Sequence, residues 1–209
     1  MPASPSWSGV ARHFPEVGPG EVMERSGIRV SAPHRLFIDR MADLTAPELV
    51  CVGDRLLRHP YRSREDRDEP YCTPEQLRSA VRRHPWTAGV VTAREALESV
   101  RIGSDSPPET LLRLAIAEAG LPEPELQAPC VPGRPGTAVG DMGYRDARII
   151  IQYEGEHHFS AEQQAHDQWR NAEFEAEGWV VILVNRVDLA ESFRRVVLRL
   201  NRLLTNAFS

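Results

Sequence analysis

The hydrophobic positions of the first half of the chain recur at helical spacing. The clearest case lies within residues 46–58, where Leu49, Val52, Leu56 and Leu57 form one apolar stripe. Residues 1–22 are rich in Pro, Gly and Ser, lack such a period, and are expected to be a disordered lead-in. A mostly helical region is expected over residues 23–103. Its other predicted helices contain Leu36 to Met41, residues 73–84, and residues 91–100 with Thr92 as the cap.

The pattern changes in residues 104–209, which we expect to form an α/β domain. Ser106-Pro-Pro-Glu109 is typical of a helix start, with Ser at the cap, Pro at the first position and Glu at the third. Short apolar runs then predict strands, and the continuous run 179–184 favours an interior strand. The layout predicts a small mixed sheet flanked by helices. The other predicted elements are strands at 127–131 and 148–153, a helix at 161–177, and a last helix capped by Asp188.

The predicted helix over residues 161–177 has two distinct sides. One side carries a stripe at i, i+4 spacing that we expect to be the main buried face. Asp167 and Arg170 lie on the other side with Phe174, and we expect them to form a buried pair that orients a neighbouring site. An exposed ion pair and a phosphate contact by Arg170 are the alternatives. The stripe consists of Ala161, Ala165, Trp169, Ala172 and Ala176, with Trp169 and Trp179 expected in the core.

The composition is not that expected of a membrane-spanning, secreted or disulfide-rich protein. No apolar run is long enough to span a membrane, and the first residues lack the pattern of a signal peptide. The three cysteines are scattered and match no metal-ligand spacing, which is typical of a reduced cytoplasmic protein. These features predict a cytoplasmic location without membrane contact.

All basic residues are arginines, so no mechanism can use a lysine ammonium as a charge stabiliser. Residues 1–105 carry 15 arginines and 15 acidic residues, whereas residues 106–209 carry 10 and 15, so the net charge of −5 belongs to the second half. A net negative charge is not typical of a protein that binds the phosphate backbone of nucleic acid tightly. Arg194, Arg195, Arg199 and Arg202 are a local exception, or else a solvated helix face.

The segment from Asp141 to His158 carries the strongest indication of chemistry. Gln152 and Glu154 project from one side of the strand that ends there. If a strand containing Asp141 pairs with it, Asp141, Gln152 and Glu154 converge on one divalent cation. Such oxygen ligands are what Mg²⁺-dependent phosphodiester cleavage needs. The alternative is a turn residue at Asp141 and the polar tip of a hairpin at Glu154.

Several further elements of this half accompany that segment in a specific order. They are Ser106-x-x-Glu109, Gly120-Leu-Pro122, Asp141, Tyr153-Glu-Gly155 with His157-His158, Asp167-x-x-Arg170, and Gly178-Trp179. Residues 106 to about 190 resemble, on these elements, the bacterial domain of unknown function related to very-short-patch-repair endonucleases. That domain belongs to the restriction-endonuclease-like PD-(D/E)xK group. Residues 27–101 resemble the segment preceding it, which often follows a winged-helix-like start related to abortive-infection antitoxins.

The resemblance implies a restriction-endonuclease-like fold and DNA cleavage by a water activated by Mg²⁺ or Mn²⁺. It implies Asp141 as the principal metal ligand, Glu154 as second ligand or water positioner, and a backbone carbonyl ligand from Tyr153. His158, or else His157, is implied as general acid or phosphate contact. Zinc binding by these histidines is disfavoured because no cysteine or third histidine has suitable spacing.

Three positions leave the chemistry open. The resemblance places Glu109 near the metal centre, but a capping glutamate bound to Ser106 is the alternative. Gln152 stands where the family usually has a carboxylate, and Leu183 where relatives often have a basic residue. A neutral amide ligand weakens metal affinity.

Three functions therefore follow from the sequence. The first is an Mg²⁺-dependent DNA endonuclease of repair or phage defence, for which double-strand cutting would need a homodimer. The second is a catalytically weakened nuclease-fold module that binds nucleic acid or regulates, as in toxin–antitoxin systems. The third is a partner-binding protein that uses its N-terminal helical region.

Overall fold

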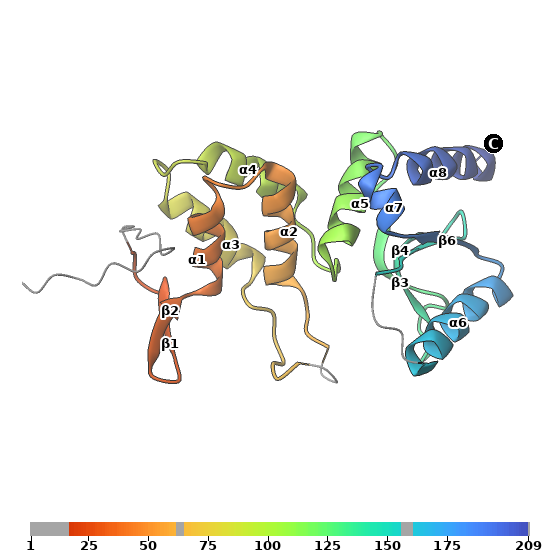
Figure 1. Cartoon of the computed structure of the whole chain (residues 1–209), viewed down its shortest axis with the longest axis horizontal. Coiled ribbons are helices and arrows are strands. Elements are labelled where there is room, and N and C mark those ends of the chain that lie inside the picture. Colours follow the sequence, from red (N-terminus) through yellow and green to blue (C-terminus); the bar gives the residue numbers. More distant parts are fainter. Residues whose placement is uncertain (1–16, 62–64, 156–160, 209) are drawn as a thin grey trace, which may run out of the picture.

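The structure, a computed structural model, describes residues 17–61, 65–155 and 161–208, and the side chains of residues 161–164 are not considered (Figure 1). Its first region contains a two-stranded hairpin followed by four helices, and the four helices share one apolar core. This agrees with the mostly helical region expected from the sequence. The elements are β1 Val22–Arg25, β2 Ile28–Ser31, α1 Pro33–Arg40, α2 Ala46–Leu57, α3 Pro74–Arg83 and α4 Val90–Ser99.

Two local predictions in this region are wrong. The hairpin was missed because its strands are mostly exposed and lack an alternating apolar face; only the Ser26-Gly27 turn, with both residues at positive φ, indicates it. Helix α4 is preceded by Gly89 rather than capped by Thr92. Gly89 has a φ of +82°, and a Cβ there would lie 1.9 Å from the Met41 carbonyl oxygen, so only glycine fits.

The second region is a four-stranded mixed sheet flanked by helices, as predicted. The strand order is β3-β4-β5-β6, with antiparallel pairing throughout except for the parallel pair β5 and β6. None of the described helices is long and apolar enough to cross a membrane. The elements are α5 Pro107–Glu118, β3 Glu125–Pro129, β4 Val139–Tyr144, β5 Ile149–Tyr153, α6 Ala161–Ala176, β6 Val180–Val184, α7 Arg186–Ala190 and α8 Arg194–Ala207.

Helices cover both faces of this sheet (Figure 1). Helices α5 and α8 pack on one face, where Leu112 and Leu200 are fully buried against strand residues such as Ile151. Helix α6 packs on the other face, where Phe174 is fully buried with Ile150. Alternate residues of β5 therefore serve two separate cores.

Two predictions at the end of the chain need correction. Strand β6 is an edge strand, not an interior one, and Val180 and Leu183 are exposed. An apolar run is compatible with this edge because β6 still packs between helices on both faces. Asp188 does not cap the last helix; it is the third residue of the short helix α7, which Asn185 caps, and α8 begins separately after Phe193.

Helix α6 packs with the side opposite to the predicted one. Trp169 is 49% exposed, whereas Phe174 is fully buried. Phe174 has no polar atom and packs against Ile150 and Trp179, so its full burial favours this side of the helix. Trp179 does lie in the core, as predicted, with its ring 5.4 Å from that of Phe174 in an edge-to-face contact. The exposed members of the predicted stripe are Ala165, Trp169, Ala172 and Ala176.

A buried ionic network joins the two regions. Asp54 of α2 accepts hydrogen bonds from Arg113 Nη2 at 2.9 Å and Thr110 Oγ1 at 2.8 Å, both on α5. Its other carboxylate oxygen accepts the Arg101 backbone N–H at 2.7 Å. Asp54 and Arg113 are 1% and 2% exposed, so this charge pair has no water to replace a lost partner.

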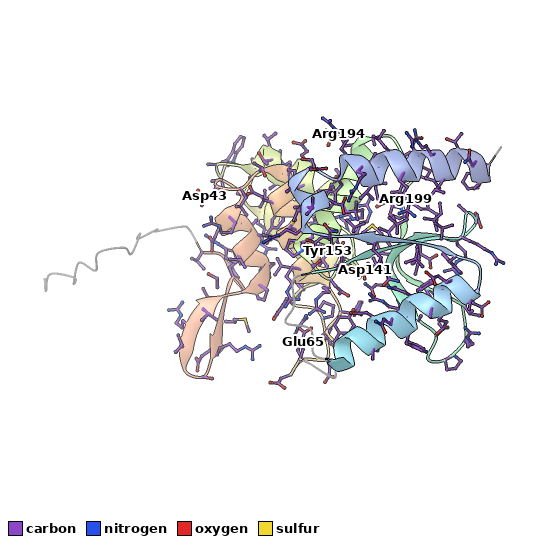
Figure 2. All side chains as sticks on the ribbon, turned by 45° about the vertical axis from the view of Figure 1, so that its right-hand side comes forward. Asp43, Glu65, Asp141, Tyr153, Arg194 and Arg199 are labelled. Carbon is purple, nitrogen blue, oxygen red and sulfur yellow. The ribbon has the colours of Figure 1, made fainter. Side chains whose placement is uncertain are left out.

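Replacing Asp54 by Ala should destabilise the protein by about 3–5 kcal/mol, because Arg113 would remain buried with only the half-exposed Glu123, 3.7 Å away, as a counter-charge. The matched control is Asp43→Ala, at an exposed aspartate that pairs with Arg40 at 3.2 Å (Figure 2). That change should cost less than about 1 kcal/mol. Denaturant unfolding measures both, and equal losses would contradict a central role for Asp54.

The packing of α6 is tested by two aromatic truncations on its opposite sides. Phe174→Ala should lower the free energy of unfolding by about 3–5 kcal/mol through the cavity it leaves. Trp169→Ala should change it by less than about 1 kcal/mol, since half of that side chain is exposed. The reverse order in thermal or denaturant unfolding would restore the alanine and tryptophan stripe as the buried face.

Candidate functional site

Asp141 lies where the backbone pairing of β4 and β5 ends. The two strands pair from Tyr144 and Ile149 to Met142 and Ile151. One residue further, the Asp141 carboxylate accepts the Tyr153 backbone N–H at 2.6 Å (Figure 2). The Asp141 side chain thus replaces a backbone carbonyl as the acceptor for this N–H group. The hydrogen bond holds one carboxylate oxygen in place, and the other oxygen takes no part in it.

Glu109, in the first turn of α5, has the capping contacts that the sequence gave as one alternative, and it also lies near Asp141. Its carboxylate accepts hydrogen bonds from Ser106 Oγ at 2.6 Å and the Asp105 backbone N–H at 2.9 Å, as in a capping box. It is also only 7% exposed and electrostatically close to Asp141. The capping bonds therefore fix a buried carboxylate beside the end of β4.

The pKa values of these two carboxyl groups show how concentrated negative charge is here. Burial, and then the charge of Asp141, raise the pKa of Glu109 to about 8. Burial also raises the pKa of Asp141 to about 6, although the Tyr153 N–H and Arg170 lower it; Asp105 and Asp167 add to the rise. A cation between these groups would relieve the repulsion.

Asp105 and Tyr61 belong to the same cluster, and sequence reasoning missed both. The Tyr61 hydroxyl donates a hydrogen bond to Asp105 Oδ2, which also accepts one from Gln127 Nε2 at 3.0 Å. Arg58 Nη1 lies 3.7 Å from the other Asp105 oxygen. Because Tyr61 and Arg58 follow α2, the first region reaches the site directly. Only the i, i+4 spacing of Asp105 and Glu109 could have indicated this cluster.

Gln152 is the most unusual residue near Asp141. It is fully buried, and among the side chains that the structure describes neither its amide nitrogen nor its amide oxygen has a hydrogen-bond partner. It projects to the same face as Ile150, which is the face covered by α6. On α6, Arg170 Nε and Asn171 Oδ1 are also buried without partners. Buried polar groups are normally satisfied, so this part of the fold suits a polar occupant such as water or an ion.

Asp167 and Arg170 form an ion pair on α6 that is part-buried, so the predicted burial of the pair is only partial. Arg170 Nη2 is 3.4 Å from Asp167 Oδ1, and their side chains are 20% and 27% exposed in that order. Their charges act on the pKa of Asp141 in opposite directions. The pair therefore lies close enough to Asp141 to orient the site, whereas a phosphate contact by Arg170 stays a prediction.

The predicted ligand set is only partly brought together. Glu154 follows β5 and is exposed, and its backbone N–H donates to the Val184 carbonyl at 2.7 Å. His157 and His158 lie outside the described residues. Within residues 17–61, 65–155 and 161–208, no group of three or more His, Cys, Asp or Glu side chains is placed to hold a metal ion. The metal-ligand set of Asp141, Glu154 and the Tyr153 backbone carbonyl stays a prediction.

Comparison with known proteins gives relatives but no activity. The chain is 27% identical over 184 residues to two Mycobacterium tuberculosis proteins, each named as uncharacterized: MT2308 of strain CDC 1551 and Rv2248 of strain H37Rv. The match covers 87% of this chain and 64% of each relative, so the chain spans less than two thirds of their length. No family model and no solved structure matches.

The raised pKa of Glu109 predicts how stability depends on pH. The folded protein binds this proton more tightly than the unfolded chain, so the benefit is complete at low pH and is lost as pH rises from about 4.5 to about 8. Glu109→Gln cannot titrate and keeps a capping side chain. Without divalent metal, its stability should therefore fall less over this range than that of the wild type.

The matched control is Glu118→Gln, an exposed position on the same helix. Urea unfolding at several pH values measures the slope for each variant. A Glu109→Gln slope equal to that of the wild type and the control would show that Glu109 does not titrate with a raised pKa.

Proposed function

We propose that the protein is an Mg²⁺- or Mn²⁺-dependent DNA endonuclease that hydrolyses phosphodiester bonds in the cytoplasm, in DNA repair or phage defence. One observation carries the proposal. The Asp141 carboxylate is held at the point where two strands stop pairing, with the fully buried, unpartnered Gln152 on the neighbouring strand. An acidic residue and an oxygen-bearing side chain on adjacent strands are suited to a divalent cation.

The donor atoms near Asp141 fit such a hard cation. They are carboxylate, amide and carbonyl oxygens, without thiolates, and the Gln152 amide oxygen lacks a partner. Asp141, Glu154, Gln152 and the Tyr153 carbonyl would hold the ion. When bound, Mg²⁺ would neutralise charge on the scissile phosphate and lower the pKa of a water.

The chain's own residues would supply positioning and proton control. The Tyr153 N–H holds one oxygen of the Asp141 carboxylate, and the charge of Arg170 on α6 lowers the pKa of Asp141 and so favours its ionised form. Glu109, with a pKa raised to about 8, can hold a proton near neutral pH, which is the property of a general acid. His157 or His158 would serve as a further acid or phosphate contact.

A weakened, non-catalytic module is the second candidate, and a specific observation favours it. The described residues contain no three-carboxylate or histidine group for a metal, and Gln152 brings no charge. Such a module would bind nucleic acid or regulate a partner, through a homodimer or through its N-terminal helices. Binding of DNA without metal-dependent cutting would distinguish it from the endonuclease.

The endonuclease predicts metal-dependent nicking of supercoiled DNA by the wild type. Asp141→Ala should reduce the rate by at least about a hundredfold, because the ion loses its main anionic ligand and no longer neutralises charge on the phosphate. Glu154→Ala should reduce it by a smaller factor. Agarose gel assays with Mg²⁺ or Mn²⁺, on supercoiled and single-stranded DNA, measure these rates.

Asp146→Ala is the control, since Asp146 is exposed in the turn between β4 and β5. It should cleave as the wild type does. Equal cleavage by Asp141→Ala would place the chemistry elsewhere, and no cleavage by any form with either metal would favour the binding module.

A further inference from the structure

Helix α8 concentrates positive charge in the more acidic half of the chain. Its residues 194–207 include Arg194, Arg195, Arg199 and Arg202 and not one Asp or Glu. Residues 106–209 as a whole carry 10 arginines against 15 acidic residues. Charge is therefore segregated onto this helix rather than mixed, as it would be on an ordinary solvated face.

The arginines occupy the outer side of α8. Val196, Leu200 and Leu204 are at most 5% exposed and form the side that packs on the sheet. Arg199 and Arg202 lie three residues apart on the exposed side, and Arg195 is four residues before Arg199. Positions at i, i+4 and i+7 share one face, so these three guanidinium groups form a row about 10 Å long.

Most of this charge is not neutralised by the protein. Arg194, Arg199 and Arg202 form no ion pair within the part of the chain that the structure describes. Arg195 pairs with the buried Asp188 at 2.8 Å, although its side chain is still 71% exposed. Elsewhere on the surface, carboxylates do neutralise arginines; for example, Arg134 lies 2.6 Å from Glu173.

A hollow lies along this row. Its volume is about 510 Å³, and its lining includes all four arginines with Leu198 and Glu191. Arg194 and Arg199 are labelled on this helix in Figure 2. The lining of the hollow includes no residue of the cluster around Asp141 and Glu109, so the hollow is separate from the candidate site.

We propose that the hollow along α8, which we term the α8 surface, binds the phosphate backbone of a nucleic acid. This deepens the proposed function, because it gives a DNA endonuclease a contact area away from its cleavage site. Along the helix axis of a duplex, a row of about 10 Å covers about three nucleotide steps of one strand at 3.4 Å each, so it can reach more than one phosphate. Guanidinium groups bind phosphate oxygens in pairs, and such contacts carry no sequence preference.

Two other anionic partners fit the helix less well. A membrane-surface helix inserts an apolar face, but the apolar side of α8 is buried in the core. An acidic protein segment would satisfy the charges, but it does not present anions at the regular spacing of a nucleic-acid strand. Both serve as competing ligands in the test.

The test measures binding of a fluorescein-labelled 20-base-pair duplex by anisotropy, in EDTA so that no cleavage occurs. Arg199→Gln with Arg202→Gln removes two charges from the surface and should leave the fold intact, since both side chains are exposed. The slope of log Kd against log salt should fall by about 2, and affinity at 0.1 M salt should drop at least about tenfold.

The control carries Arg78→Gln and Arg94→Gln, two exposed positions on α3 and α4. It has the same net charge as the first variant and should keep the slope and affinity of the wild type. Equal losses in both double variants would show a general charge effect and overturn the proposal. So would tighter binding of the wild type to phosphatidylserine vesicles or to polyglutamate than to the duplex.

Failure of this inference is distinguishable from failure of the proposed function. Metal-dependent nicking with unchanged binding by the Arg199 and Arg202 variant would overturn the α8 surface alone. Conversely, the expected loss of binding without nicking by any form would support the α8 surface and overturn the endonuclease.

Discussion

The buried contact between Asp54 and Arg113 is the interaction on which the rest of the molecule depends. It fixes α2 against α5, and α5 in turn carries Glu109 and packs on the sheet. The loop that follows α2 brings Tyr61 and Arg58 to Asp105, one turn before Glu109. The candidate site is therefore built by both regions, and a chain reduced to residues 104–209 would lack part of it. A buried ion pair gives little net stability over apolar packing, but it does specify one relative arrangement.

Negative charge without lysine defines the chemistry that this site can perform. Asp105, Glu109 and Asp141 influence one another, and Arg170 is the nearby cation that lowers the pKa of Asp141. A guanidinium group cannot release its proton, so it can orient a carboxylate but cannot act as a base. Proton transfer is therefore left to carboxyl groups with raised pKa values and to histidines. A divalent cation would supply the remaining positive charge.

Sequence patterns predicted the helices and strands better than they predicted which side of each element is buried and which distant residues it contacts. Helix α2 and strand β5 follow from local periodicity, β3 begins two residues before the predicted strand, and the mixed sheet follows from the order of the elements. The buried side of α6 did not, because the choice between an alanine stripe and Phe174 depends on the shape of the sheet. The hydrogen bond between Glu109 and Ser106 was predictable because capping is local, whereas a role of Glu109 at a metal centre stays a prediction. Asp105 and Tyr61 were missed because 44 residues separate them along the chain.

The two charged areas should respond differently to acidity. Every group that makes the α8 surface positive is a guanidinium, which stays protonated at any physiological pH. The carboxyl groups around Asp141 instead gain and lose protons near neutrality. A change of one or two pH units would thus alter the charge at the candidate site while the α8 surface keeps its own. Binding of a nucleic acid at the α8 surface would therefore not depend on pH in this range, whereas its cleavage at the candidate site would.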